Sequence, residues 1–369
     1  MAKIGLPSLS IVFEEKGIAR IKRSDRGIVA LVVQEKKLKG NYNIYNIGQI
    51  PEGLSEKNKE QVELALIGYQ KSPKKVILVV EQSETAENPK FDVSSEGFKY
   101  LETVRWDYLA VPFIDSDDSQ KVATWIKNLN DNYKKRCKVV LPNTAGDNRK
   151  IINYTMPMVK SATKEYKTNE YLSRIAGFIA GCPMQIATTF GPLPELVDCT
   201  YYDKEELEQR IGKGEFVLMN DGEKIKVARG VNSLTTTSQI EGESFRKIKI
   251  VDIMDAMADD IQHEAEDSYL GKYANSYDNK CLLMSAIKGY MEVLENDSLL
   301  AKGQSDVQID LEAQKAFLDS IGYRTPDGRN TDEMDIKEIK EADTKDQVFL
   351  LATCKILDAI EEIQLKVEI

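Results

Sequence analysis

The run Val76-Ile-Leu-Val-Val80 is apolar at every position and decides the fold class. A strand with one wet face alternates apolar and polar residues, whereas a strand that is covered on both faces is apolar throughout. A second run of this kind, Ile28–Val33, lies upstream. Two such strands favour a mostly parallel sheet with helices on both sides.

The segments around these two strands alternate between strand and helix patterns up to about residue 142. Further strands are expected at Tyr42–Ile47, Tyr108–Ile114 and Lys138–Leu141, and helices at Ser55–Gln70 (capped by Ser55), Gly97–Val104 and Gln120–Tyr133. This alternation predicts an α/β domain and leaves the strand order open.

Two local patterns follow in the next hundred residues. A predicted helix, Tyr171–Gly181, carries Gly177 and Gly181 four residues apart, a spacing that permits close packing of helices. Asn220-Asp-Gly-Glu223 lies between two short apolar runs and predicts a β-hairpin.

From about Phe245 the pattern becomes mainly helical, with helices expected around residues 250–261, at Asp278–Glu295 and at Asp310–Ile321, and a loop at Gly322–Asn330. We expect a compact α+β domain here. The predicted division of the chain is an N-terminal arm (1–26), an N-terminal α/β portion (27–95), an α/β core with the hairpin (96–244), a C-terminal domain (245–360) and an arm strand (361–369).

The spacing of apolar residues changes near the end of the chain. Thr344–Ile360 is predicted as an amphipathic helix, because Thr344 and Gln347 form a capping-box pattern and apolar residues recur at the helical spacing. Beyond Glu362 the period is two, which predicts a strand. Its apolar face consists of Ile363, Leu365, Val367 and Ile369.

An apolar stripe at a terminus requires a surface to cover it, since chain ends are usually frayed and polar. One interpretation is an edge strand of the chain's own sheet, and the other is a strand donated to another subunit. The N-terminus favours the second interpretation, because it too has strand character before a basic joint at residues 22–26. Its apolar positions are Leu9, Ile11, Phe13, Ile18 and Ile21.

Composition narrows the function further. The 369 residues carry a net charge of −10, which argues against a nucleic-acid-binding face and against docking on anionic membranes. The longest apolar run, Ile175–Pro183, is too short to span a bilayer, and Met1–Leu9 lacks the apolar core of a signal peptide. Five scattered cysteines without a Cys-x-x-Cys pair suggest neither a disulfide framework nor a zinc site. We therefore expect a soluble protein made in a reducing cytoplasm.

The best enzymatic candidate is Asp115-Ser-Asp-Asp-Ser119, directly after a predicted strand. It is similar to the haloacid-dehalogenase motif, in which Asp115 would be the nucleophile, Asp117 the acid/base, and Mg²⁺ would complete the site. That chemistry needs a second acidic pair at a later strand end, but Asp259-Asp260 falls within a predicted helix. As a calcium loop the stretch fails too, because Ile126 occupies the position of the bidentate glutamate. The favoured interpretation is a cap for the helix that begins near Ser119.

Other signatures of catalysis are weak. His263 is the single histidine and lies in an acidic run that is typical of a solvated helix face. Gly212-Lys-Gly214 lacks the remaining residues of a P-loop and is predicted as a turn into the hairpin. There is no Gly-x-Gly-x-x-Gly after the first strand and no Gly-x-Ser-x-Gly elbow. We therefore expect no catalytic, cofactor-binding or metal-binding residues, with an Asp115/Asp117 phosphohydrolase as the alternative.

The chain resembles the tail sheath proteins of contractile phages and R-type bacteriocins, particularly the short sheaths of phages and phage-like particles of Gram-positive bacteria. Four stretches, which span nearly the full length, carry the likeness: Arg23-Ser-Asp-Arg-Gly-Ile-Val-Ala-Leu31, Arg246–Ile261, Gly271–Lys280 and Asp346–Ile369.

The resemblance implies an α/β core of subtilisin-like shape without a catalytic triad, a compact C-terminal domain, and arms that complete a sheet on another subunit. It also implies a mechanical function without cofactor or ATPase, in which rings of subunits stack around a tail tube and contract to drive the tube through a cell envelope. The implied partners are other copies of the chain, the tube protein, and baseplate and tail-terminator proteins. The implied location is the bacterial cytoplasm during assembly and the tail of a particle after release.

Arms that stay attached while subunits move need hinges. On the N-terminal side the candidates are Gly17 and Arg23, and on the C-terminal side Glu361, where the predicted helix gives way to a strand.

Overall fold

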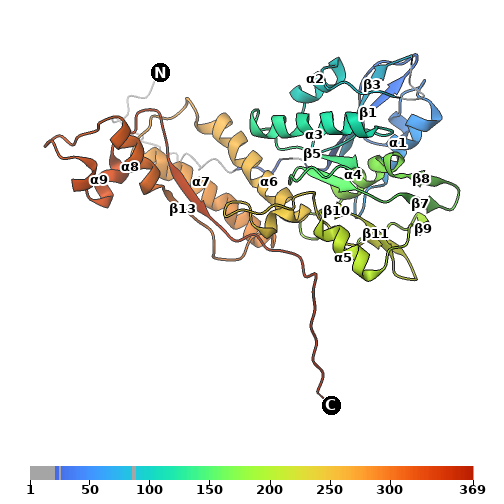
Figure 1. Ribbon diagram of the computed structural model, residues 1–369. Helices are drawn as coiled ribbons and strands as arrows, with labels where there is room; N and C mark the ends of the chain where they lie inside the picture. The colour runs from blue at the N-terminus through green and yellow to red at the C-terminus, as the bar shows by residue number, and fades with distance from the viewer. Residues whose placement is uncertain (1–20, 25, 85–88, 369) are drawn as a thin grey trace, which may run out of the picture. The chain divides into compact units, whose positions relative to one another are not determined.

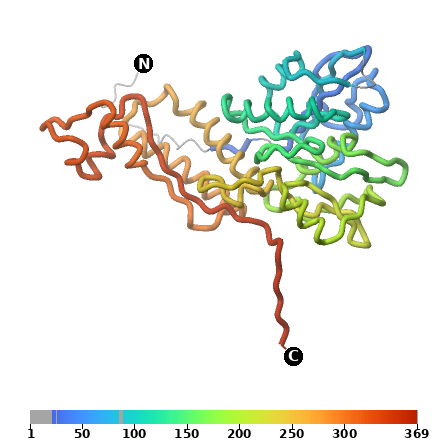
Figure 2. The backbone as a smooth tube through the Cα atoms, in the orientation of Figure 1, coloured from blue at the N-terminus to red at the C-terminus, as the bar shows by residue number. Residues whose placement is uncertain are grey.

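The computed structural model describes residues 21–24, 26–84 and 89–368. Two compact units make up the chain. The sheet unit comprises Arg23–Asp259, Asp297–Leu299 and Ile356–Ile369, and the helical unit includes Asp260–Asn296 and Leu300–Lys355. Figure 2 shows the backbone of both units, coloured by residue number from the N-terminus to the C-terminus.

The sheet unit is built on a seven-stranded sheet with the order β10-β6-β5-β4-β1-β3-β2, as counted over the described residues. All neighbouring strands are parallel except the antiparallel pair β2–β3. The strands are β1 (Ile28–Glu35), β2 (Gly40–Ile44), β3 (Lys75–Gln82), β4 (Tyr108–Ala110), β5 (Lys138–Pro142), β6 (Ile151–Tyr154) and β10 (Glu215–Phe216). All eight residues of β1 and the run Val76–Val80 of β3 are buried, which confirms the predicted α/β class.

Helices cover both faces of this sheet (Figure 1). α1 packs on α4, which also contacts β1, β4 and β5. α2 and α3 share a layer, because the rings of Phe98 and Trp125 meet edge to face at 5.1 Å. The helical segments of this unit are η1 (Ile47–Gln49), α1 (Glu56–Ile67), α2 (Glu96–Thr103), α3 (Ser116–Asp131), η2 (Thr168–Glu170), α4 (Leu172–Ala180), α5 (Lys204–Gly212) and η3 (Glu243–Arg246).

The predicted helices of the sheet unit are confirmed to within a few residues at their ends, with one difference at a cap. Ser55 occupies the N-cap of α1, but its hydroxyl donates to Glu35 Oε1 at 2.7 Å instead of accepting from the helix. Gly177 allows the close packing that its spacing predicted, since an added Cβ would lie 2.0 Å from the carbonyl oxygen of Ala65 in α1.

Two smaller sheets complete this unit. The predicted hairpin is present as β11 (Leu218–Asn220) and β12 (Ile225–Val227), with Asn220 opposite Ile225. The second is an antiparallel sheet in the order β8-β7-β9, which the sequence patterns did not indicate. Its strands are β7 (Met158–Ser161), β8 (Glu165–Lys167) and β9 (Leu196–Cys199).

The three helices predicted after Phe245 are present, the first of them mostly within the sheet unit. The elements of the helical unit, with α6 beginning in the sheet unit, are α6 (Ile248–Glu264), the π-helix η4 (Ala265–Tyr269), α7 (Tyr277–Asn296), β13 (Asp306–Ile309), α8 (Leu311–Ser320), η5 (Thr331–Glu333), α9 (Ile336–Glu341) and β14 (Leu350–Thr353). Over the described residues, none of the helices combines the length and the apolar character needed to cross a lipid bilayer.

The helix predicted at Thr344–Ile360 is wrong. Leu350–Thr353 instead forms β14, which pairs antiparallel with β13 so that Leu350 lies opposite Ile309. The Thr344 hydroxyl donates to the carbonyl oxygen of Gln347, and Lys345 has a φ of 57°, so the expected cap is a turn. Pairing with a distant strand has overridden a local helical pattern, as tertiary contacts often do.

The packing at Gly177 gives a stability test. Gly177→Ala places a methyl group against the α1 backbone and is expected to lower the free energy of unfolding by about 1–3 kcal/mol. The matched control is Gly289→Ala in α7, where nothing lies within 4 Å of an added Cβ. That change is expected to stabilise the helix by up to about 1 kcal/mol. Urea unfolding followed by circular dichroism measures both, and equal stabilities for the two variants would contradict the packing argument.

Candidate functional site

The acidic stretch after β4 is a helix cap. Asp115 is the N-cap of α3, and its carboxylate accepts a hydrogen bond from Asp118 N at 2.8 Å and pairs with Lys90. The bond from the Asp118 amide is the main reason that the pKa of Asp115 is lowered. Asp118 in turn accepts from Phe91 N at 2.8 Å. The carboxylates therefore hold the start of the helix, as the sequence favoured, and the phosphohydrolase alternative is not supported.

The single histidine and the cysteines are the other candidate chemical groups. His263 is exposed on α6, with Nε2 3.4 Å from Asp267 Oδ2. All five cysteines are free, and burial raises the pKa of both Cys137 and Cys182 to about 12, so these thiols are poor nucleophiles. Within the described ranges no group of three or more His, Cys, Asp or Glu side chains is placed to hold a metal ion.

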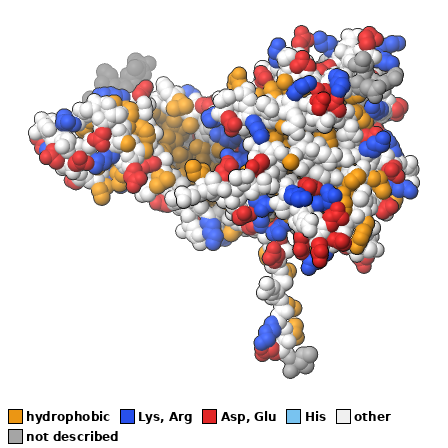
Figure 3. Space-filling model, viewed as in Figure 1, with side chains coloured by type: hydrophobic (Ala, Val, Ile, Leu, Met, Phe, Trp, Pro, Cys, Tyr) orange, Lys and Arg blue, Asp and Glu red, His pale blue; other side chains and the backbone are white. Residues whose placement is uncertain are grey.

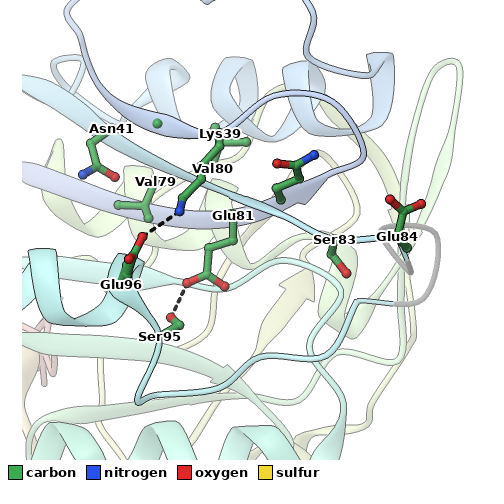
Figure 4. Close-up of a pocket in the computed structure, with 12 residues that line it drawn as sticks. Lys39, Asn41, Val79, Val80, Glu81, Ser83, Glu84, Ser95 and Glu96 are labelled. Atoms are coloured by element: carbon green, nitrogen blue, oxygen red, sulfur yellow. Dashed lines mark hydrogen bonds and ion pairs between the residues drawn. The ribbon is translucent and has the colours of Figure 1, made fainter.

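A cleft lies beside the carboxyl end of β3, next to the start of α2 (Figure 4). Lys39 Nζ bonds Glu96 Oε2 at 2.6 Å, and the Ser95 hydroxyl bonds Glu81. Burial raises the pKa of Glu81, against the effect of its hydrogen bonds. These two pairs of polar groups thus satisfy each other.

A cluster of buried charges fixes α6 to the sheet. Lys138, at the start of β5, is buried, and its Nζ lies 2.9 Å from Asp252 and 2.5 Å from Asp255. Lys150 pairs with the same Asp255. Burial disfavours the charge on Asp255, but the two lysines outweigh burial and hold its pKa at about 2.

Three arginines extend this cluster along α6. Asp259 pairs with Arg26 and Arg136 at 2.9 Å each and with Arg105 at 3.5 Å. Each arginine lies a few residues before a strand of the main sheet (β1, β5 and β4, respectively). The amino ends of three neighbouring strands thus bind one helix through charge.

The C-terminal segment lies outside every sheet. Residues 361–368 have no strand assignment, and the side chains of Ile363, Leu365 and Val367 are 83%, 82% and 70% exposed. Hydrophobic atoms are open to view along this segment in Figure 3. The structure therefore gives no support to the interpretation that these residues form an edge strand of their own chain's sheet, and Ile369 lies outside the described residues.

The β13–β14 sheet of the helical unit is short of strands. Its inner face is formed by Val307 and Ile309, which are buried, whereas on β14 Leu350 is half-buried and Leu351–Thr353 are exposed. Among the described residues β14 pairs with β13 alone. Each of its two strands therefore has one edge that pairs with no other strand among the described residues.

The root of the C-terminal segment is held firmly. The Glu361 carboxylate accepts from Thr189 Oγ1 at 2.6 Å and pairs with Arg229 Nη2 and Lys247 Nζ, both at 3.0 Å. Its side chain is 8% exposed. Burial works against the charge, but Thr189, Lys247 and Arg229 prevail and lower the pKa of Glu361. We call Thr189, Arg229 and Lys247 the Glu361 socket.

Three distant segments supply this socket, so no spacing in the sequence could have identified it. Of the N-terminal arm candidates, Ile21 is buried and Arg23 pairs with Asp297. The other predicted arm and hinge positions lie outside the described residues: Leu9, Ile11, Phe13, Gly17 and Ile18.

Comparison with known proteins matches most of the chain to two family models. Residues 84–233 match the phage tail sheath protein central domain, and residues 241–369 match the phage tail sheath C-terminal domain. The chain is also 33% identical over 369 residues to the tail sheath protein of Clostridium phage phiCD119, covering 99% of each.

Solved structures share the fold. The sheath tail protein from Desulfitobacterium hafniense has a TM-score of 0.67 at 15% identity, covering 82% of this chain and 94% of that one. The helical sheath of the anti-feeding prophage in its contracted state has a TM-score of 0.68 at 14% identity, with 99% of both chains covered.

The buried cluster on α6 gives a second test. Asp255→Asn takes the carboxylate from buried Lys150 and leaves buried Lys138 with Asp252 alone, and it is expected to cost about 3–5 kcal/mol of unfolding free energy. The control Asp267→Asn removes an exposed carboxylate and is expected to cost less than about 1 kcal/mol. Because the folded pKa of Asp255 is lowered, its contribution is present above the unfolded value of about 3.9 and is lost as pH falls toward 2.

The measurement is urea unfolding of both variants and the parent between pH 7 and pH 3. A difference between the parent and Asp255→Asn that stays level down to about pH 4 and then shrinks supports the cluster. Equal stabilities for the two variants at pH 7 would contradict it.

Proposed function

This chain belongs to the phage tail sheath protein family, and from that premise we propose that copies of it polymerise into a sheath around a tail tube. As a member of this family, it is a structural component of a phage tail or a tail-like particle. The proposed mechanical function is contraction of the sheath, which drives the tube through a cell envelope.

The observation that carries the proposal is the uncovered apolar stripe at the C-terminus. Ile363, Leu365 and Val367 alternate with Gln364, Lys366 and Glu368, so an extended backbone places the three apolar side chains on one face. Full burial of each is worth about 1.5–3 kcal/mol. Since these side chains are exposed in their own chain, a second subunit is the proposed cover.

The proposed acceptor is the β13–β14 sheet of another copy. An added strand would pair its backbone with a free edge of that sheet and would place its apolar face beside Val307, Ile309 and Leu350. The same addition would turn a two-stranded sheet into a larger one. The same chain thus carries a segment with a strand pattern that belongs to no sheet and a two-stranded sheet to which a strand could be added.

The N-terminal arm is proposed to make a similar contact through Leu9, Ile11, Phe13 and Ile18, with hinges at Gly17 and Arg23. Ile21, the fifth predicted contact, is already buried in its own chain. We also propose that the domains have the limits expected from the sequence. Two arms per subunit would join each copy to several neighbours and keep them tethered during movement.

Contraction needs two packings of the same subunits that differ in free energy. We place the energy source in the lattice formed during assembly, without a nucleotide or other cofactor. The further proposed partners are the tube, baseplate and tail-terminator proteins, with assembly in the bacterial cytoplasm. Neither nucleic acid nor direct membrane insertion has a part in this mechanism.

The arm gives a sharp test by single substitution. Leu365→Asp places a charge on the face that is to be buried, whereas Gln364→Asp places the same charge on the opposite face one residue away. We expect Leu365→Asp to yield a folded subunit with at least about a hundredfold fewer tubes, because burial of an unpaired charge costs several kcal/mol. Gln364→Asp is expected to assemble as the parent does.

Electron microscopy of each protein, co-expressed with its tube protein, counts the tubes, and circular dichroism verifies the fold. Deletion of Glu361–Ile369 and the double change Leu365→Asp with Val367→Asp are expected to repeat the loss. Parental amounts of tubes from these variants would refute the arm.

A further inference from the structure

The inference concerns the place where the C-terminal arm leaves its own subunit. Just before the exposed stripe, residues 356–361 are fastened to the sheet unit at several points. Leu357 N donates to Leu299 O at 2.9 Å, Lys247 pairs with Asp358, and Glu361 fills the socket. One residue later the side chain is exposed: Glu362 Oε1 lies 3.5 Å from Arg229 Nη2.

The socket is built by loops that are themselves fixed. Thr189 Oγ1 donates to Glu361 and also accepts from Gly230 N at 3.0 Å, so it joins the loop before β9 to the loop after β12. Gly230 permits this approach, because an added Cβ would lie 2.3 Å from Thr188 Oγ1. Phe190 has a φ of 56°, a costly conformation for an aromatic residue that persists only where its surroundings enforce it.

The socket also has the chemistry to hold a carboxylate strongly. Two cations and a hydroxyl converge on one side chain that is almost completely excluded from water, and charged hydrogen bonds in such places are stronger than neutral ones. Lys247 binds the segment 356–361 at two points, because it pairs with Asp358 as well as with Glu361. A surface ion pair alone would contribute little.

We propose that Glu361 is a positioning residue whose carboxylate, held by Thr189, Arg229 and Lys247, fixes the exit point of the C-terminal arm. The arm bends beyond this point, at residues 362 and later, and residues 356–361 move with the sheet unit. This inference rests on the proposed sheath function and revises its hinge, since Glu361 is the fixed end and not the moving part. A fixed exit point limits which neighbour's sheet an arm of eight residues can reach.

The test compares Glu361→Gln with Glu362→Gln. Each substitution removes one negative charge, and both residues contact Arg229. Only Glu361→Gln removes the carboxylate that the Glu361 socket binds. Hydrogen–deuterium exchange of the unassembled full chain reads the root directly through the amides of residues 357–362. We expect Glu361→Gln to speed this exchange at least about tenfold, as loss of a charged hydrogen bond worth about 1.4 kcal/mol implies. Glu362→Gln is expected to match the parent, and exchange in β1 and β3 is expected to stay unchanged in both.

A second readout is assembly with the tube protein. Glu361→Gln, with its apolar stripe intact, is expected to give fewer or irregular tubes, whereas Glu362→Gln gives regular ones. Exchange at the root that is equal in Glu361→Gln and the parent would overturn the anchor, and so would regular tubes from a variant whose root exchanges fast. If the parent forms no tubes, the sheath function is overturned instead. The anchor can still be judged in that case, because the exchange measurement uses the unassembled chain.

Discussion

Three apolar side chains near the C-terminus, Ile363, Leu365 and Val367, are exposed to water in the described chain. The proposed assembly depends on covering them. Apolar surface of this kind is stable only when something covers it. The β13–β14 sheet, which is short of strands, offers a matching need on the same molecule. In the proposed sheath, each copy would meet both requirements through its neighbours in the lattice.

The rest of the sheet unit gives that lattice rigid parts. β1 and the run Val76–Val80 of β3 are buried, and α6 is bound by charge to the amino ends of three strands. The Glu361 socket then fastens the root of the arm to this body. Force carried by an arm would therefore reach a packed sheet, while the flexible part would be confined to a few residues beyond the anchor.

The parts predicted well from the sequence are those whose cause is local. The apolar run Val76–Val80, the hairpin turn at Asp221 and the glycine at 177 each meet in the structure the environment that their residue types require. Asp115 lies at a helix cap for the same reason. The failures have long-range causes: β14 was mistaken for a helix because its partner β13 is distant in sequence, and the Glu361 socket joins residues from positions 189, 229, 247 and 361.

The most direct test of strand exchange is a cryo-EM reconstruction of tubes assembled from this protein, at a resolution that traces the last eight residues. Strand exchange predicts density that leaves Glu361, crosses to another copy and pairs with its β13–β14 sheet, with Ile363, Leu365 and Val367 facing the inner side. Density that folds back onto its own subunit, or that stays unpaired in a well-ordered tube, would contradict it.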